Sequence, residues 1–148
     1  MRIHASCVVI GEAGVLIRGP SGSGKSTLAR RLLSAAERGG RYASLVSDDR
    51  TELAERNGRV LARPVAPIEG KIEVRGVGIL TRSFEPAAVV RLVVDCLARP
   101  EARLPQESES YSGFGNIRIP RLVTLGEAGF AEIVLWRLCD LRDTPATL

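Results

Sequence analysis

The sequence is poor in cysteine and contains no long apolar run. Its three cysteines, Cys7, Cys96 and Cys139, lie far apart and are odd in number, which is not the spacing of a metal site or of a disulfide framework. We expect them to be small buried thiols. No stretch approaches the roughly twenty apolar residues that a membrane-spanning helix needs, and the first residues lack the layout of a signal peptide. We therefore expect no membrane partner and a cytoplasmic location.

Lysine is also scarce, because Lys25 and Lys71 are the only two among 21 basic residues. The net charge of +4 is modest, and the arginines are scattered along the chain. Such a surface suits an anionic ligand or an acidic partner, but it lacks the concentrated basic patch typical of nucleic-acid binding. We therefore expect no nucleic-acid partner. A lysine inside a glycine-rich loop of so arginine-biased a chain points to a specific task for Lys25.

The composition is that of one globular domain. A chain of 148 residues can bury a substantial core, and 45% hydrophobic with 26% charged residues is a globular balance. No internal repeat or domain boundary is visible. We expect a single domain over residues 1–143, followed by a frayed tail at 144–148.

Apolar runs separated by turn signals predict more strands than helices. The runs expected to form strands are residues 3–10, 15–18, 42–47, 88–97 and 117–125. Helical spacing predicts helices over 26–38 and 130–143, and Asn57-Gly58 predicts a tight hairpin turn. The polar segment 98–116 is expected to be an irregular, functional or mobile loop. Hairpins before and after the first helix do not fit the alternating strand–helix–strand order of an ordinary parallel sheet.

The strongest motif is GPSGSGKST at residues 19–27, which fits G-x-x-x-x-G-K-[ST]. Glycines let successive N–H groups point at one anion, and the following helix adds the positive end of its dipole. Lys25 would reach the β and γ phosphates, and Ser26 can ligate Mg²⁺. A flexible turn before a helix is the alternative. The residues expected to bind nucleotide are Gly19, Pro20, Ser21, Gly22, Ser23, Gly24, Lys25, Ser26 and Thr27.

Phosphoryl transfer also needs carboxylates, for which two positions compete. Asp48-Asp49 follows one apolar strand, whereas Asp95 lies within another apolar run. Paired aspartates at a strand end are the better arrangement, since their repulsion is relieved by a cation or a shared proton. A helix cap or a turn is the alternative for this pair. Two further positions are weak evidence of function when taken singly. These are His4, near the terminus, and Glu73, which is expected on the exposed face of a strand with Arg75 on the same face.

Taken in order, these residues resemble a known family. His4, the phosphate loop, SDDR at 47–50, IEVRGVGIL at 72–80 and IRIPRL at 117–122 are similar to the catalytic domain of HPr kinase/phosphorylase. That bacterial enzyme uses ATP to phosphorylate a serine of the phosphocarrier protein HPr, and so regulates the phosphotransferase system. The most specific element is E-x-R-G-x-G-I, formed by Glu73, Arg75, Gly76, Gly78 and Ile79. The similarity extends from His4 to about Leu125.

The resemblance implies a role for each matching residue. Lys25 would be a catalytic cation, and Ser26 and Glu73 would be the Mg²⁺ ligands beside ATP. Asp49 would accept the proton during phosphorylation and donate it in the reverse reaction, with Asp48 as a support. His4 would be an active-site histidine, and Arg103 would contact the reacting phosphate. Arg75, Gly76 and Gly78 would be supporting residues of the signature.

The resemblance further implies an α/β fold in which a hairpin-rich mixed sheet surrounds the P-loop, as in phosphoenolpyruvate carboxykinase. The chain would be a short form without the family's N-terminal domain, and a homo-oligomer is a state that the family allows. TLGEAGF at 124–130 lacks the basic residues usual in a segment important for dephosphorylation, which favours kinase over phosphorylase activity. The alternatives are a P-loop small-molecule kinase and a non-catalytic ATP-binding sensor.

Overall fold

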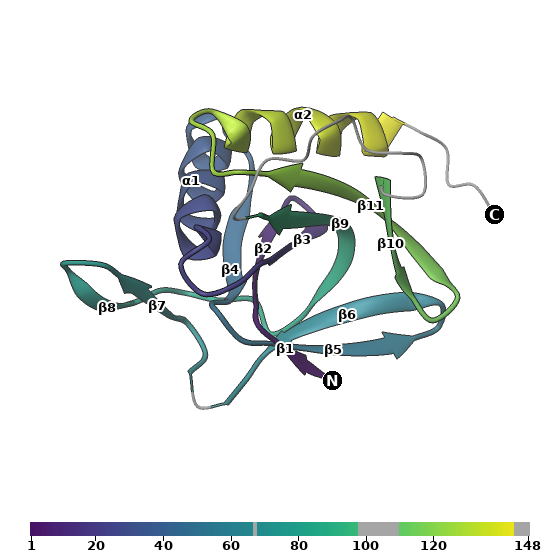
Figure 1. Cartoon of the computed structure of the whole chain (residues 1–148), viewed down its shortest axis with the longest axis horizontal. Coiled ribbons are helices and arrows are strands. Elements are labelled where there is room, and N and C mark those ends of the chain that lie inside the picture. Colours follow the sequence, from purple (N-terminus) through teal and green to yellow (C-terminus); the bar gives the residue numbers. More distant parts are fainter. Residues whose placement is uncertain (67, 98–109, 144–148) are drawn as a thin grey trace.

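The computed structural model describes residues 1–66, 68–97 and 110–143, in which a curled mixed sheet carries two helices on one side (Figure 1). The helices are α1 (Lys25–Arg38) and α2 (Phe130–Asp143). The strands are β1 (Arg2–Ile3), β2 (Ala5–Ile10), β3 (Ala13–Arg18), β4 (Ala43–Ser47), β5 (Thr51–Arg56), β6 (Arg59–Pro64), β7 (Lys71–Val74), β8 (Gly78–Thr81), β9 (Ala88–Cys96), β10 (Tyr111–Phe114) and β11 (Ile117–Thr124). Neither helix is long and apolar enough to cross a bilayer, within the residues described.

The sheet combines hairpins with parallel pairs. Its main path runs β1-β5-β6-β9-β3-β2-β4, and β11 joins β9 with β10 beside it. The expected tight turn between β5 and β6 is confirmed, because Asn57 and Gly58 have φ of 54° and 75°, as a type I′ turn requires. The hairpin-rich mixed sheet expected from the sequence is therefore confirmed.

Four strands end at the same side of the sheet. Both β3 and β11 run parallel to β9, and they lie on opposite edges of it because both pair with the segment 93–95. Strand β4 runs in the direction of β3, since each is antiparallel to β2. Ligands of such sheets bind outside the carboxyl ends of parallel strands. The phosphate loop after β3 and the aspartates after β4 are thus brought to one end of the molecule.

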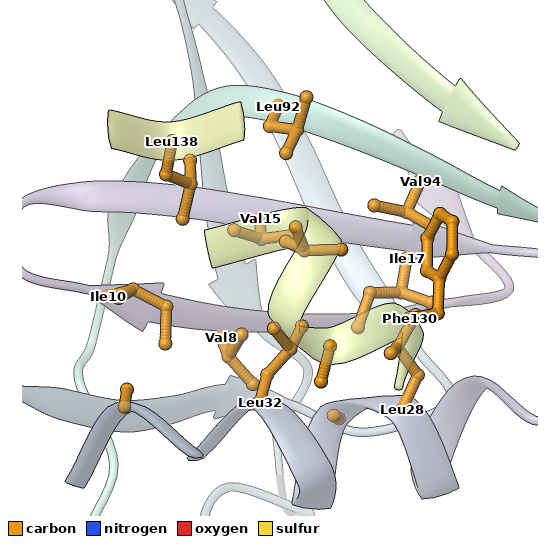
Figure 2. Packing of buried hydrophobic residues seen from close by; sticks show 14 of the residues in the cluster. Val8, Ile10, Val15, Ile17, Leu28, Leu32, Leu92, Val94, Phe130 and Leu138 are labelled. Carbon is orange, nitrogen blue, oxygen red and sulfur yellow. The ribbon is translucent and has the colours of Figure 1, made fainter. Parts of the chain in front are cut away.

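Apolar side chains fill both faces of the central strands. Val8 and Ile17 pack against Leu32 of α1 and Phe130 of α2 in the cluster between sheet and helices (Figure 2). The alternate residues Ala5, Cys7 and Val9 of β2 belong to a second cluster inside the curl of the sheet. A strand that is covered on both sides reads as a continuous apolar run, as β2 does. Burial raises the pKa of the Cys7 thiol to about 12, so this cysteine is a buried thiol as expected.

Asp95 proves to be a structural carboxylate inside β9. Arg18 donates to both of its oxygens at 2.8 Å, and Arg121 of β11 donates to Oδ2. Burial tends to raise the pKa of Asp95, but the hydrogen bonds and charges of these two arginines outweigh it and hold the pKa below its ordinary value. Because each arginine comes from a different neighbouring strand, Asp95 ties β3, β9 and β11 together.

The expectation of an irregular segment up to Asn116 is wrong for its last part. Residues 111–114 form β10 and pair antiparallel with β11. Ser112 and Gly113 in the middle of this short strand mask it in the sequence, and the pairing with β11 stabilises it. The rest of the expected loop, 98–109, and the tail 144–148 lie outside the described residues.

We predict that Asp95→Asn lowers the free energy of unfolding by about 3 kcal/mol near neutral pH, because it leaves two arginines without their carboxylate. The folded-state pKa of Asp95 is depressed, so its stabilisation is present above the unfolded pKa of about 4 and is lost as pH falls through the folded value. Urea unfolding of both proteins from pH 7 down to pH 3 measures this. The exposed Glu52→Gln is the control, and a difference that stays constant to pH 3 would contradict the assignment.

Candidate active site

The phosphate loop turns sharply between β3 and α1. Gly19, Gly22 and Gly24 all have positive φ, at 155°, 80° and 98°. A Cβ on Gly19 would lie 2.5 Å from Ser23 Oγ and 2.6 Å from the carbonyl oxygen of Cys96. Only glycine fits this close approach, so the loop is held against the end of β9.

The loop residues are suited to a phosphate group. Lys25 is only 5% exposed, and its Nζ donates to the carbonyl oxygen of Pro20 at 3.1 Å. Ser23 Oγ is buried and has no hydrogen-bond partner among the described residues. The first turn of α1 carries no acidic residue, so its free N–H groups and dipole face the loop without a competing charge. A buried cation, an unpaired hydroxyl and a helix amino end together favour an anion here.

Asp48 is a buried carboxylate that joins the loop to the sheet. Its side chain accepts hydrogen bonds at Oδ1 from Ser26 Oγ at 2.6 Å and from Ser6 Oγ at 2.9 Å. Its other oxygen, Oδ2, lies 3.3 Å from the backbone N–H of Glu73. Asp48 is 8% exposed, so these donors replace the water that an ionised carboxylate needs. The residue thereby fixes Ser26 relative to β4.

Asp49, in contrast, is partly open to solvent. Its φ of 63° is left-handed, which aspartate tolerates better than most residues, and its N–H donates to Ser6 Oγ at 3.0 Å. The side chain is 54% exposed, and Oδ1 lies 3.7 Å from Lys25 Nζ. The structure therefore brings the second aspartate to the mouth of the phosphate loop.

His4 lies next to the aspartate pair along the backbone. The N–H of Ala5 donates to the carbonyl oxygen of Asp49 at 3.1 Å, which places the neighbouring His4 at the same level of the sheet. His4 is exposed. The start of the chain and the aspartate pair are therefore neighbours in the fold, although they are far apart in the sequence.

The signature residues form the hairpin β7–β8, which projects from the body beside the loop (Figure 1). Ile72 is buried in the helix-side core and anchors it. Glu73 is exposed on β7, whereas Arg75 lies beyond the strand, in the turn. The expectation that Arg75 shares a strand face with Glu73 is therefore wrong, because Gly76, with φ of 81°, lets the chain reverse directly after Val74. Arg103 lies outside the described residues.

Ser6 is the site residue that the sequence analysis missed. It is fully buried, and its hydroxyl contacts both aspartates, through Asp48 Oδ1 and the Asp49 N–H. A lone serine within an apolar strand was the available signal. No cluster of three or more His, Cys, Asp or Glu side chains suited to a metal occurs in the described parts of the chain.

We predict that the two aspartates contribute unequally to the free energy of unfolding. Asp48→Asn should lower the free energy of unfolding by about 2 kcal/mol, because the amide turns a donor toward Ser26, Ser6 or the Glu73 N–H and weakens charge-assisted hydrogen bonds. The matched Asp49→Asn should change it by about 1 kcal/mol or less, since the Asp49 side chain is 54% exposed and its Oδ1 lies 3.7 Å from Lys25 Nζ, beyond hydrogen-bond distance. Urea denaturation monitored by circular dichroism measures both, and equal losses would contradict the buried-hub role of Asp48.

The sequence and the fold both match known proteins. The model of the HPr Serine kinase C-terminal domain family matches residues 1–91. The chain is 38% identical over 79 residues to the HPr kinase/phosphorylase of Clostridium beijerinckii, covering 53% of this chain and 24% of the relative. It is 32% identical over 111 residues to that of Neisseria meningitidis serogroup C, covering 70% and 33%.

A solved structure extends the likeness beyond the matched residues. The HPr(Ser) kinase/phosphatase from Coxiella burnetii superposes with a TM-score of 0.76 over 96% of each chain, at 23% identity, and so shows the fold. The chain spans about a quarter to a third of the length of these curated relatives. The phosphate loop, both aspartates and the signature hairpin all fall within residues 1–91, whereas 117–122 and Arg103 do not. The chain therefore belongs to the HPr serine kinase C-terminal domain family.

Proposed function

We propose that the chain is a cytoplasmic, ATP- and Mg²⁺-dependent protein serine kinase whose substrate is an HPr-type phosphocarrier protein. One observation carries the proposal. Ser26 and Lys25, the two loop side chains suited to Mg²⁺ and phosphate, contact Asp48 and Asp49 respectively. Phosphoryl transfer needs such a combination of phosphate cradle, metal ligand and carboxylate within one site.

The loop residues 19–27 would hold the nucleotide phosphates. ATP would supply the transferable phosphoryl group, and Mg²⁺ would neutralise charge on its oxygens. Ser26 and Glu73 are the proposed metal ligands, and both are positioned through Asp48, which binds the hydroxyl of one and the backbone of the other. Lys25, buried in the loop, would place its ammonium against the phosphates.

Asp49 is the proposed proton acceptor. Its carboxylate is exposed at the loop mouth and lies close to Lys25, so an incoming serine hydroxyl could approach it. The oxygens of Asp48 are engaged by the two serine hydroxyls and the Glu73 N–H, and they are buried. A base must be within hydrogen-bond reach of the proton it removes, which favours Asp49. His4 and Arg103 are proposed to assist, at the positions that the family resemblance implies.

The segment after β11 supports kinase activity over the reverse reaction. It follows Thr124, the last residue of β11, which pairs with Cys96 at the end of β9, so it lies at the same end of the sheet as the phosphate loop. Its charged side chain is Glu127, whose pKa is held below the ordinary value by hydrogen bonds from the Thr124 hydroxyl and from backbone N–H groups. A fixed negative charge there disfavours binding of free inorganic phosphate for reversal.

We predict that Asp49→Asn leaves Mg²⁺·ATP affinity within about threefold but lowers the rate of transfer by at least about a hundredfold, as loss of a general base does. Lys25→Ala should instead weaken nucleotide binding and transfer together. Labelled ATP with purified HPr-type protein and phosphoserine detection measures transfer, and calorimetric titration measures binding.

Glu37→Gln, at the far end of α1, is the control and should behave as the parent protein. Wild-type transfer by Asp49→Asn would overturn the base assignment. Label on an added metabolite instead of the HPr-type protein would indicate a small-molecule kinase, and ATP binding without any transfer would indicate a nucleotide sensor.

A further inference from the structure

A second concave site lies at the end of the sheet opposite the phosphate loop. It is a groove of about 880 Å³ beside the β2–β3 turn, the start of β11 and the last turns of α2. Arg18 and Asp95, near the phosphate loop, are the last residues of the β3–β9 pairing, whereas Gly14 and Val90, at the groove, are the first. The two sites are therefore separated by the length of the strands. The groove volume falls in the range of small-molecule pockets, roughly 300 to 1,000 Å³.

A β-bulge directs one arginine out of the core at this groove. Gly14 pairs with Val90 and the next residue, Val15, pairs with Leu92, so Arg91 is an extra residue in β9. A Cβ on Gly14 would lie 2.7 Å from the carbonyl oxygen of Val89, which means that the bulge depends on this glycine. Bulges commonly re-aim a side chain near a functional site. Arg91 is exposed between two buried neighbours and lines the groove.

Positive charge gathers here from separate elements. Four arginines line the groove, namely Arg41 before β4, Arg59 of β6, Arg91 of β9 and Arg118 of β11. A single carboxylate, Glu12, lines it as well. Within the described parts of the chain, no ion pair joins a carboxylate to any of these four arginines. Arg118 instead stacks on the Tyr111 ring with its guanidinium carbon 4.3 Å from the centroid. Arg41 donates one N–H to Cys139 Sγ, and guanidinium N–H groups with no carboxylate partner can donate to carboxylate or phosphate oxygens.

The floor of the groove is apolar. Val89, Ile117 and Leu141 line it and are partly exposed, so they would contact the carbon skeleton of a ligand while the arginines contact its charged groups. We propose that this groove binds a small organic anion that carries two or more carboxylate or phosphate groups. The site is independent of the proposed kinase activity, because none of its residues belongs to the phosphate loop or the aspartate pair.

Citrate serves as the probe in a ¹H–¹⁵N NMR titration of the full chain at about 0.15 M KCl, where weak surface attraction is screened. We expect saturable shifts of the Gly11, Arg91 and Arg118 amide signals with a dissociation constant of about 1 mM or tighter. Arg91→Gln combined with Arg118→Gln should weaken binding at least about tenfold, whereas Lys25→Ala should leave it unchanged. Arg30→Gln with Arg31→Gln, on the exposed face of α1, makes the same charge change and should alter affinity by less than about twofold.

Several results would overturn the proposal. These are shifts confined to Gly22 and Gly24 of the phosphate loop, equal weakening by the control pair, and absence of saturation. Binding of a hexaglutamate peptide without binding of citrate would also overturn it, in favour of a protein partner. If the double variant fails to fold, Arg59→Gln and Arg118→Gln, compared singly with Arg30→Gln, carry the same test, since each should weaken binding more than the control.

Discussion

A single buried carboxylate determines how the candidate site is assembled. Asp48 follows β4 and accepts hydrogen bonds from Ser6 of β2, from Ser26 of α1 and from the backbone of Glu73 in β7. An ionised group with little access to water must be satisfied by such donors, so the elements that supply them cannot shift independently. The left-handed turn at Asp49 then directs the next side chain to solvent. Two adjacent aspartates thus acquire different environments.

Asp95 differs from Asp48 because the strand register determines which donors its carboxylate meets. Asp48 follows an apolar run and Asp95 lies within another, so both were candidates for the catalytic carboxylate in the sequence. Asp95 lies opposite Arg18 in the β3–β9 pairing, and its oxygens are engaged by Arg18 and Arg121. It holds together the parallel strands beneath the phosphate loop, where Gly19 touches the end of β9. The hydrogen-bond partners therefore separate a carboxylate that ties strands together from one that joins the phosphate loop to the sheet.

Local signals predicted the elements that depend on local physics. The 130–143 helix, the Asn57-Gly58 turn and the phosphate loop follow from periodicity, positive φ and glycine spacing, and the structure has the helix at Phe130–Asp143. The parallel pairings join strands far apart in sequence, and the short β10, with serine and glycine at its centre, is held by its pairing with β11. Ser6 was missed for the same reason. A buried hydroxyl in an apolar strand is informative only once the fold has brought the aspartate pair within its reach.

The bulge at Arg91 resolves a conflict within β9. Strict alternation would place Val90 on the same face as Leu92 and Val94, yet Val90 packs inside the curl while the other two face the helices. The extra residue reverses the alternation, and the arginine, which neither core could bury unpaired, is left outside both. Without the bulge, a single register would have to bury Arg91 or expose its apolar neighbours. One strand can therefore supply Asp95 at one end and an exposed cation at the other, although its sequence reads as a nearly continuous apolar run.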